Sequence, residues 1–137
     1  MKKVRNNYKS KNRHKYLIKY HFIFSIKYRK KLLRIIGDWV KNKMKEVSEN
    51  SDFNIDILEV DGDHIHVLVD SSPNLSPTSI ARKLKQETTY HIYRSEYKYL
   101  LDGAFYKENT LWADGYFVCS TGEASTKTVI DYIKNQG

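Results

Sequence analysis

The pattern of hydrophobic and polar positions predicts a strand, a helix and a two-stranded hairpin in the first half of the chain. Residues 14–28 carry aromatic or β-branched side chains at every second position, which is strand spacing. Apolar residues then recur at helical spacing from Leu33 to about Glu49. Residues 53–60 and 64–70 alternate again, and Asp61-Gly62-Asp63 between them predicts a tight turn, so these two strands should form a hairpin.

Three further elements are predicted in the second half: a helix capped by Ser76 or Thr78 and ending near Tyr93, a strand over residues 111–120, and a helix that begins at Ser125 or Thr126 and ends near Gln136. The order strand, helix, strand, strand, helix, strand, helix predicts an α+β fold with a ferredoxin-like or RNA-recognition-like antiparallel sheet. Two helices should cover one face of the sheet. The other face should be open to a ligand.

Length and charge indicate one basic domain. The 137 residues suit a single hydrophobic core, which we expect over residues 14–137, preceded by a basic arm of residues 1–13. There are 24 Lys and Arg against 16 Asp and Glu, a net charge of +8, together with 11 Tyr. Lysines neutralise phosphates and aromatic rings stack on unpaired bases, so nucleic acid is the leading candidate partner, with a merely solvated basic surface as the alternative.

Cysteine content and hydropathy limit the compartment. The single cysteine, Cys119, excludes an intrachain disulfide and a cysteine-based zinc cluster. No stretch approaches the roughly 20 apolar residues that cross a bilayer, so we expect no membrane association. The expected location is the cytoplasm, with action at the nucleoid.

His64 and His66 lie two residues apart on a predicted strand, so their side chains share one face, about 7 Å apart at Cα. Two imidazoles placed this way can bind one divalent cation together, or they can be half-buried structural histidines. The pattern alone leaves both interpretations open. Asp61 and Asp63 either shape the turn or accept a hydrogen bond from a ring N–H. The remaining histidines, His14, His21 and His91, are expected to be structural.

Other residues could take part in catalysis or in DNA binding, but each also has a simple structural explanation. Tyr132 and Gln136 are four residues apart and so share one face of the last predicted helix. The plain alternative is a tyrosine at the edge of an apolar stripe and an exposed amide near the end of the helix. Candidate phosphate contacts, with a solvated face as the alternative, are Lys31, Arg82, Lys83 and Lys85.

Several separated segments resemble one known family. His64-Ile65-His66 followed by Val67-Leu68-Val69 resembles the histidine-hydrophobic-histidine motif of the HUH endonuclease superfamily. Residues 111–122 (LWADGYFVCSTG) and 129–136 (VIDYIKNQ) resemble segments of the single-tyrosine transposases, the TnpA type, of small prokaryotic insertion sequences. Residues 27–31 (KYRKK) and 79–85 (SIARKLK) extend the resemblance, which runs from about Tyr16 onward.

The resemblance implies a specific chemistry. His64, His66 and Gln136 would bind a divalent ion, Mg²⁺ or Mn²⁺, and Tyr132 would be the nucleophile that forms a 5′-phosphotyrosine link and releases a 3′-hydroxyl. The expected substrate is single-stranded DNA with hairpins at transposon ends. The family also implies a homodimer in which the tyrosine helix of one subunit serves the histidines of the other, in trans.

Three other readings stay open. A relaxase or replication initiator of the same superfamily usually carries extra domains or a second catalytic tyrosine, which this chain does not have. A non-catalytic ferredoxin-like module for single-stranded nucleic acid would place aromatic residues on the open sheet face instead of histidines. A defective transposase that binds hairpins without cutting is disfavoured by the intact His64, His66, Tyr132 and Gln136.

Overall fold

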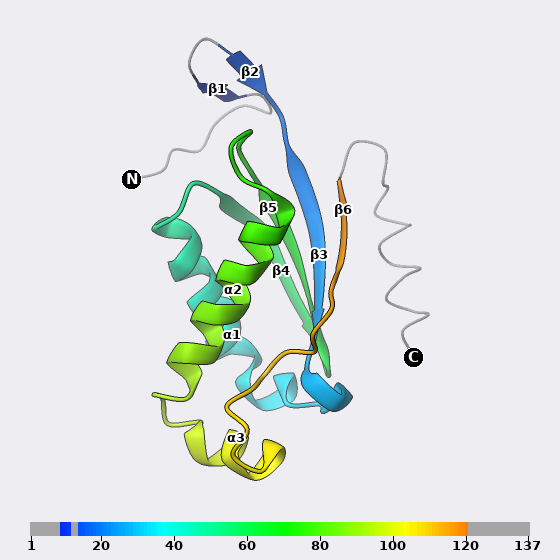
Figure 1. Ribbon diagram of the computed structural model, residues 1–137, viewed down its shortest axis with the longest axis vertical. Helices are drawn as coiled ribbons and strands as arrows, with labels where there is room; N and C mark the ends of the chain where they lie inside the picture. Colours follow the sequence, from blue (N-terminus) through cyan, green and yellow to red (C-terminus); the bar gives the residue numbers. More distant parts are fainter. Residues whose placement is uncertain (1–8, 12–13, 121–137) are drawn as a thin grey trace.

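The computed structural model describes residues 9–11 and 14–120, which form two antiparallel sheets (Figure 1). The small sheet pairs β1 (Lys9–Lys11) with β2 (His14–Tyr16). The main sheet has the strand order β4-β5-β3-β6. Its members are β3 (Lys19–Ser25), β4 (Asn54–Asp61), β5 (His64–Asp70) and β6 (Phe117–Ser120), and every neighbouring pair is antiparallel.

The long strand predicted over residues 14–28 is divided by the tertiary structure. Leu17 and Ile18 separate β2 from β3, and β3 stops at Ser25. A 3-10 turn, η1 (Lys27–Arg29), follows, in which Tyr28 and Arg29 take positive φ angles of 61° and 56°. Left-handed backbone cannot continue a strand, so the chain turns here although the side-chain alternation continues.

Two helices cover one face of the main sheet (Figure 1). They are α1 (Leu33–Glu49) and α2 (Pro77–Ile92), both close to their predicted bounds. The Ser76 hydroxyl caps α2 by accepting the Ser79 N–H at 3.0 Å. Between helices and sheet lies the core, whose fully buried members include Phe22, Phe24, Ile36, Val40, Ile65, Val67, Val69 and Leu84. The alternate strand positions predicted to be apolar therefore face the helices.

The second half of the chain contains one helix that the hydrophobic pattern did not predict. This helix, α3 (Lys98–Phe105), has eight residues and buries Leu101 and Phe105 completely. Two apolar anchors over two turns are too few to establish a helical period in the sequence. The strand predicted over residues 111–120 is shorter than expected, because only Phe117–Ser120 pair with β3 and Trp112 makes an isolated bridge to Ile26.

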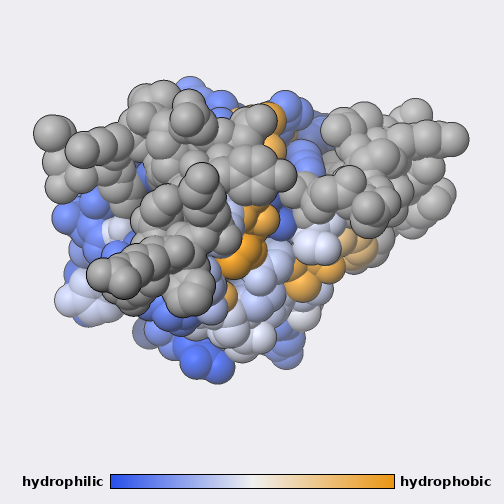
Figure 2. All heavy atoms as spheres, turned by 90° about the horizontal axis from the view of Figure 1, so that it is seen from above, coloured by the Kyte–Doolittle hydropathy of each residue, from blue (hydrophilic) through white to orange (hydrophobic). Residues whose placement is uncertain are grey.

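The predicted fold class is confirmed, since the chain forms an α+β structure with a four-stranded antiparallel sheet and helices packed on one face. The predicted C-terminal helix with Tyr132 and Gln136 lies outside the described residues. Seen from the end shown in Figure 2, the visible described surface is mostly hydrophilic, with hydrophobic residues in a narrow band. None of the helices within the described ranges is long and apolar enough to span a membrane.

Candidate active site

The β4–β5 hairpin sets the direction of the two predicted histidines. Ile65, Val67 and Val69 of β5 point into the core, so His64 and His66 point to the opposite face, which we call the histidine face. The hairpin turn needs Gly62, which has a φ of +62°. Its backbone is also tied to the rest of the fold, because the Asp63 carbonyl accepts the N–H of Ile26 at 2.7 Å.

His64 is held by a chain of polar side chains at the turn. Its Nδ1 lies 2.8 Å from Oδ1 of Asp63, and the other carboxylate oxygen of Asp63 accepts the Nε–H of Arg29 at 2.9 Å. Burial would raise the pKa of Asp63, but the hydrogen bonds from His64 and Arg29 and the Arg29 charge outweigh burial and lower it. The carboxylate is therefore ionised and accepts the Nδ1–H of His64.

The other ring nitrogen of His64, Nε2, is buried and makes no hydrogen bond within the described residues. The residue as a whole is only 7% exposed. The nearest carboxylate oxygen recorded for it, Oδ2 of Asp61, is 4.0 Å away. A buried polar atom without a partner is costly unless something binds it, and a lone pair on an imidazole backed by a carboxylate is suited to a metal ion.

His66 contacts His21, one of the histidines for which the sequence predicts a structural role. Its Nε2 lies 2.7 Å from Nδ1 of His21, and the two rings are nearly parallel, with centroids 4.9 Å apart. Burial lowers the pKa of His21, and the neighbouring His66 lowers it further. Burial also lowers the pKa of His66, against an opposing effect of the Glu59 carboxylate. Both rings are thus predominantly neutral near pH 7.

The position of His21 was available in the sequence. Residues 20, 22 and 24 of β3 are the aromatic positions of the predicted alternation and face the core, so His21 falls on the opposite, odd-numbered face. What the alternation does not provide is the strand order. The register pairs Ile23 with His66 and His21 with Leu68, which makes His21 and His66 diagonal neighbours on one face.

The histidine face offers two of the three predicted metal ligands. Glu59 and Asp61 of β4 lie opposite His66 and His64 in the register. Within residues 9–11 and 14–120, however, no three His, Cys, Asp or Glu side chains are grouped so that they could hold a metal ion. The donor chemistry of the two imidazoles fits a divalent ion, and a site with three protein ligands would need one from outside the described residues. Gln136, and the predicted nucleophile Tyr132, lie outside the described residues.

The four basic residues predicted to contact phosphate are not gathered at one place. Lys31 is exposed and its side chain passes the hairpin turn, where Cδ lies 4.0 Å from the position of a Cβ added to Gly62. Arg82 and Lys83 are exposed on α2, on the other side of the sheet from the histidines. Lys85 is partly buried, and its ammonium donates to the carbonyls of Ala113 and Asp114 at 2.7 and 3.2 Å.

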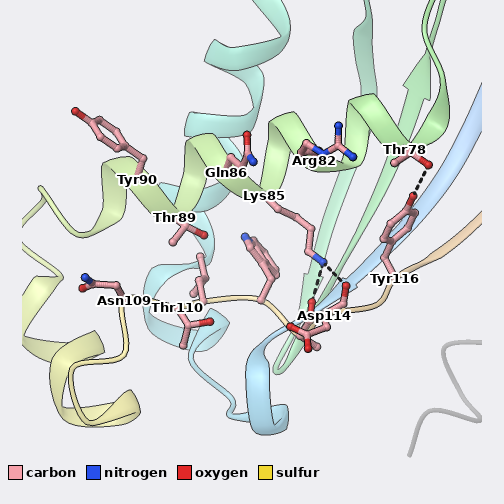
Figure 3. A pocket seen from close by; sticks show the side chains of 13 residues that line it. Thr78, Arg82, Lys85, Gln86, Thr89, Tyr90, Asn109, Thr110, Asp114 and Tyr116 are labelled. Carbon is pink, nitrogen blue, oxygen red and sulfur yellow. Dashed lines mark hydrogen bonds between the residues drawn. The ribbon is translucent and has the colours of Figure 1, made fainter.

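A separate cavity of about 570 Å³ opens between α2 and residues 109–116 (Figure 3). Arg82, Lys85, Gln86 and Tyr90 line it from the helix, and Trp112 and Tyr116 line it from the facing segment. No histidine is among its lining residues. Because α2 packs on the core face of the sheet, the cavity lies on the opposite side of the sheet from the histidine face.

Comparison with known proteins gives consistent results across sequence and structure. Residues 14–136 match the family model described as "Transposase IS200 like". The transposase for insertion sequence element IS200 of Salmonella typhimurium is 31% identical over 127 residues, which cover 86% of this chain and 76% of that protein. The ISDra2 transposase TnpA of Deinococcus radiodurans is 23% identical over 122 residues, covering 88% of this chain and 85% of the relative.

Two solved structures share the fold. The crystal structure of a putative transposase from Deinococcus radiodurans has a TM-score of 0.76 at 24% identity, covering 99% of this chain and 98% of the other. The structure of a REP-associated tyrosine transposase bound to a REP hairpin has a TM-score of 0.54 at 17% identity, covering 98% of this chain and 68% of the other.

Proposed function

The chain belongs to the family of IS200-like transposases, and from this premise we propose that it cleaves and rejoins single-stranded DNA through a covalent bond to Tyr132. In the cleavage step the Tyr132 oxygen attacks the scissile phosphorus. A P–O bond to tyrosine forms, the P–O3′ bond breaks, the phenolic proton passes to solvent, and the leaving oxygen takes up a proton to become a 3′-hydroxyl. The product is a 5′-phosphotyrosine link.

The reverse displacement rejoins DNA. A 3′-hydroxyl of another DNA end attacks the phosphotyrosine, restores a phosphodiester and releases the Tyr132 hydroxyl, so no external energy source is needed. A divalent ion, Mg²⁺ or Mn²⁺, held by His64, His66 and Gln136 would supply positive charge to the phosphate oxygens. Asp63 and Arg29 orient His64 for this role.

One observation carries the proposal: the Nε2 of His64 is buried and has no hydrogen-bond partner among the described residues, while an ionised carboxylate lies behind its Nδ1. A core histidine of purely structural purpose would have both nitrogens satisfied. The composition of the histidine face supports the same conclusion. Among the described residues of the main sheet, Phe117 is the one Phe, Tyr or Trp on that face, which is too few for the base-stacking surface of a non-catalytic module.

For the substrate we propose hairpin-bearing single-stranded DNA at the ends of an insertion sequence. The net charge of +8 supports an anionic partner, and the exposed Lys31, Arg82 and Lys83 are proposed to contact phosphates. We further propose that the protein acts as a homodimer whose tyrosine helix serves the partner's histidines.

The test uses 5′- and 3′-labelled single-stranded DNA carrying a hairpin, incubated with the full chain with and without Mg²⁺. We expect a metal-dependent covalent adduct that disappears in Tyr132→Phe and in His64→Ala. Tyr99→Phe is the matched control, because Tyr99 is 86% exposed on α3 and should keep full activity. Cleavage that persists in Tyr132→Phe would exclude Tyr132 as the nucleophile.

Mixing two inactive variants tests the shared active site. Tyr132→Phe keeps the histidines and His64→Ala keeps the tyrosine, so a mixed dimer contains one intact composite site only if the tyrosine works in trans. We expect activity to reappear in the mixture after subunit exchange. A mixture that stays inactive while both variants demonstrably exchange subunits would assign catalysis to single chains.

A further inference from the structure

The sheet places His21 so that, among the described residues, its side chain has a hydrogen bond to a proposed metal ligand, His66. It sits on β3, a central strand with β5 on one side and β6 on the other. It is 6% exposed, and its Nδ1 lies 2.7 Å from Nε2 of His66. At that separation the two nitrogens share one hydrogen bond.

A bond between two imidazoles contains one proton, which gives two arrangements with different consequences. If His21 Nδ1–H donates to His66 Nε2, a neutral His66 carries its own proton on Nδ1 and has no lone pair left. If His66 Nε2–H donates to His21 Nδ1, the Nδ1 of His66 is unprotonated and available. Only the second arrangement lets His66 bind a cation while the contact with His21 remains intact.

We propose that His21 is a positioning residue whose Nδ1 accepts the Nε2–H of His66, so that His66 presents Nδ1 to the divalent ion. This inference rests on the proposed function, in which His66 is a ligand. It assigns opposite tautomers to the two ligands. His64 presents Nε2 with Asp63 behind its Nδ1, and His66 presents Nδ1 with His21 behind its Nε2.

The pairing explains why a neutral ring suits position 21 better than an acid. Glu59 lies directly opposite His66 on β4, in the exposed edge strand. A buried carboxylate at position 21 would add a second negative charge beside His66 on the side away from solvent, at a large desolvation cost. A neutral imidazole accepts the same hydrogen bond and holds the ring orientation without that cost.

Nuclear magnetic resonance of the metal-free full chain tests the assignment without any substitution that alters the site. Long-range ¹H–¹⁵N spectra of the imidazoles distinguish a protonated from an unprotonated ring nitrogen. We expect His66 as the Nε2–H tautomer and His64 as the Nδ1–H tautomer at neutral pH. Finding His66 protonated on Nδ1 instead would overturn the proposal.

Mn²⁺ binding, measured from the electron paramagnetic resonance signal of free Mn²⁺, provides the second readout. Loss of an outer-shell partner typically weakens metal affinity by about 10–100-fold, and we expect this for His21→Leu. His21→Asn keeps an acceptor oxygen near the position of Nδ1 and should retain most of the affinity. His91→Ala is the matched control, since His91 is a partly exposed histidine on α2 that pairs with Glu87 and lies outside the histidine face.

The outcomes separate the two proposals. If His21→Leu binds Mn²⁺ as tightly as the unmodified chain while His64→Ala does not bind, His21 has no positioning role and the metal site stands. If Leu and Asn at position 21 weaken binding equally, the effect is one of packing and the proposal fails. If His64→Ala leaves Mn²⁺ affinity unchanged, the proposed metal site itself is wrong.

Discussion

Replacing Asp63 with asparagine should disable His64 while leaving the backbone of the turn in place. In the native chain, one carboxylate oxygen faces His64 Nδ1 at 2.8 Å and the other faces Arg29 Nε at 2.9 Å, and both neighbours are donors. Asparagine has one acceptor oxygen and one NH₂ group, so it cannot accept from both. The Arg29 charge favours the amide oxygen, and the NH₂ group is then turned toward His64.

This orientation reverses the tautomer of His64. Facing an NH₂ donor, Nδ1 must accept, so the ring proton moves to Nε2 and removes the lone pair proposed for the metal. Perturbing such outer-shell partners costs about 10–100-fold in metal affinity, or about 1.4–2.8 kcal/mol at about 1.4 kcal/mol per factor of ten. The Asp63 side chain is 15% exposed and that of His64 is 8% exposed, so water is poorly placed to replace the lost acceptor.

The assay is Mn²⁺ binding by electron paramagnetic resonance, with the imidazole ¹⁵N spectrum as a direct record of the tautomer. Asp56→Asn is the matched control, because Asp56 also forms a salt bridge on β4, to Lys19 at 3.0 Å, but at the end of the sheet away from His64. Adding Arg29→Gln to the Asp63→Asn variant provides an acceptor for the asparagine NH₂, so the amide oxygen can turn toward His64. The double variant should recover part of the Mn²⁺ affinity. Unchanged affinity in Asp63→Asn would refute the role given to this carboxylate.

Two further substitutions test the packing around the cavity in Figure 3. Lys85→Met should lower the free energy of unfolding by about 2 kcal/mol, because the hydrogen bonds from its charged ammonium to the carbonyls of residues 113 and 114 are lost. Lys83 is exposed, so the control Lys83→Met should lower it by less than about 0.5 kcal/mol. Equal midpoints for the two variants in urea unfolding would contradict this. Burial raises the pKa of Tyr93, so the unfolded chain releases the phenolic proton first and stability should fall as the pH rises above about 10. Tyr93→Phe loses the hydrogen bonds with Thr110, which lowers the free energy of unfolding by about 1–2 kcal/mol near pH 7. This loss of stability relative to the unmodified chain should shrink above about pH 10. A loss that stays constant across that range would show that Tyr93 does not titrate as proposed.

The sequence by itself determined the elements with long, regular patterns and the residues that lie on each face of them. The apolar period predicts α1 and α2, and the alternation around Asp61-Gly62-Asp63 predicts the hairpin that places His64 and His66 on one face. These features depend on neighbours in the chain, so a local pattern contains them. The family resemblance joined Tyr132 and Gln136 to them, and those two roles stay predictions.

Only the tertiary structure decided which side chains meet. The end of β3 at Ser25 follows from the left-handed backbone at Tyr28, which no hydrophobic pattern reveals. The contact of His21 with His66 joins residues 45 positions apart, and it exists because β3 lies beside β5 in one register. Strand order and register depend on the packing of the whole sheet against α1 and α2, so the same alternation in β3 is compatible with a histidine that touches His66 and with one that does not.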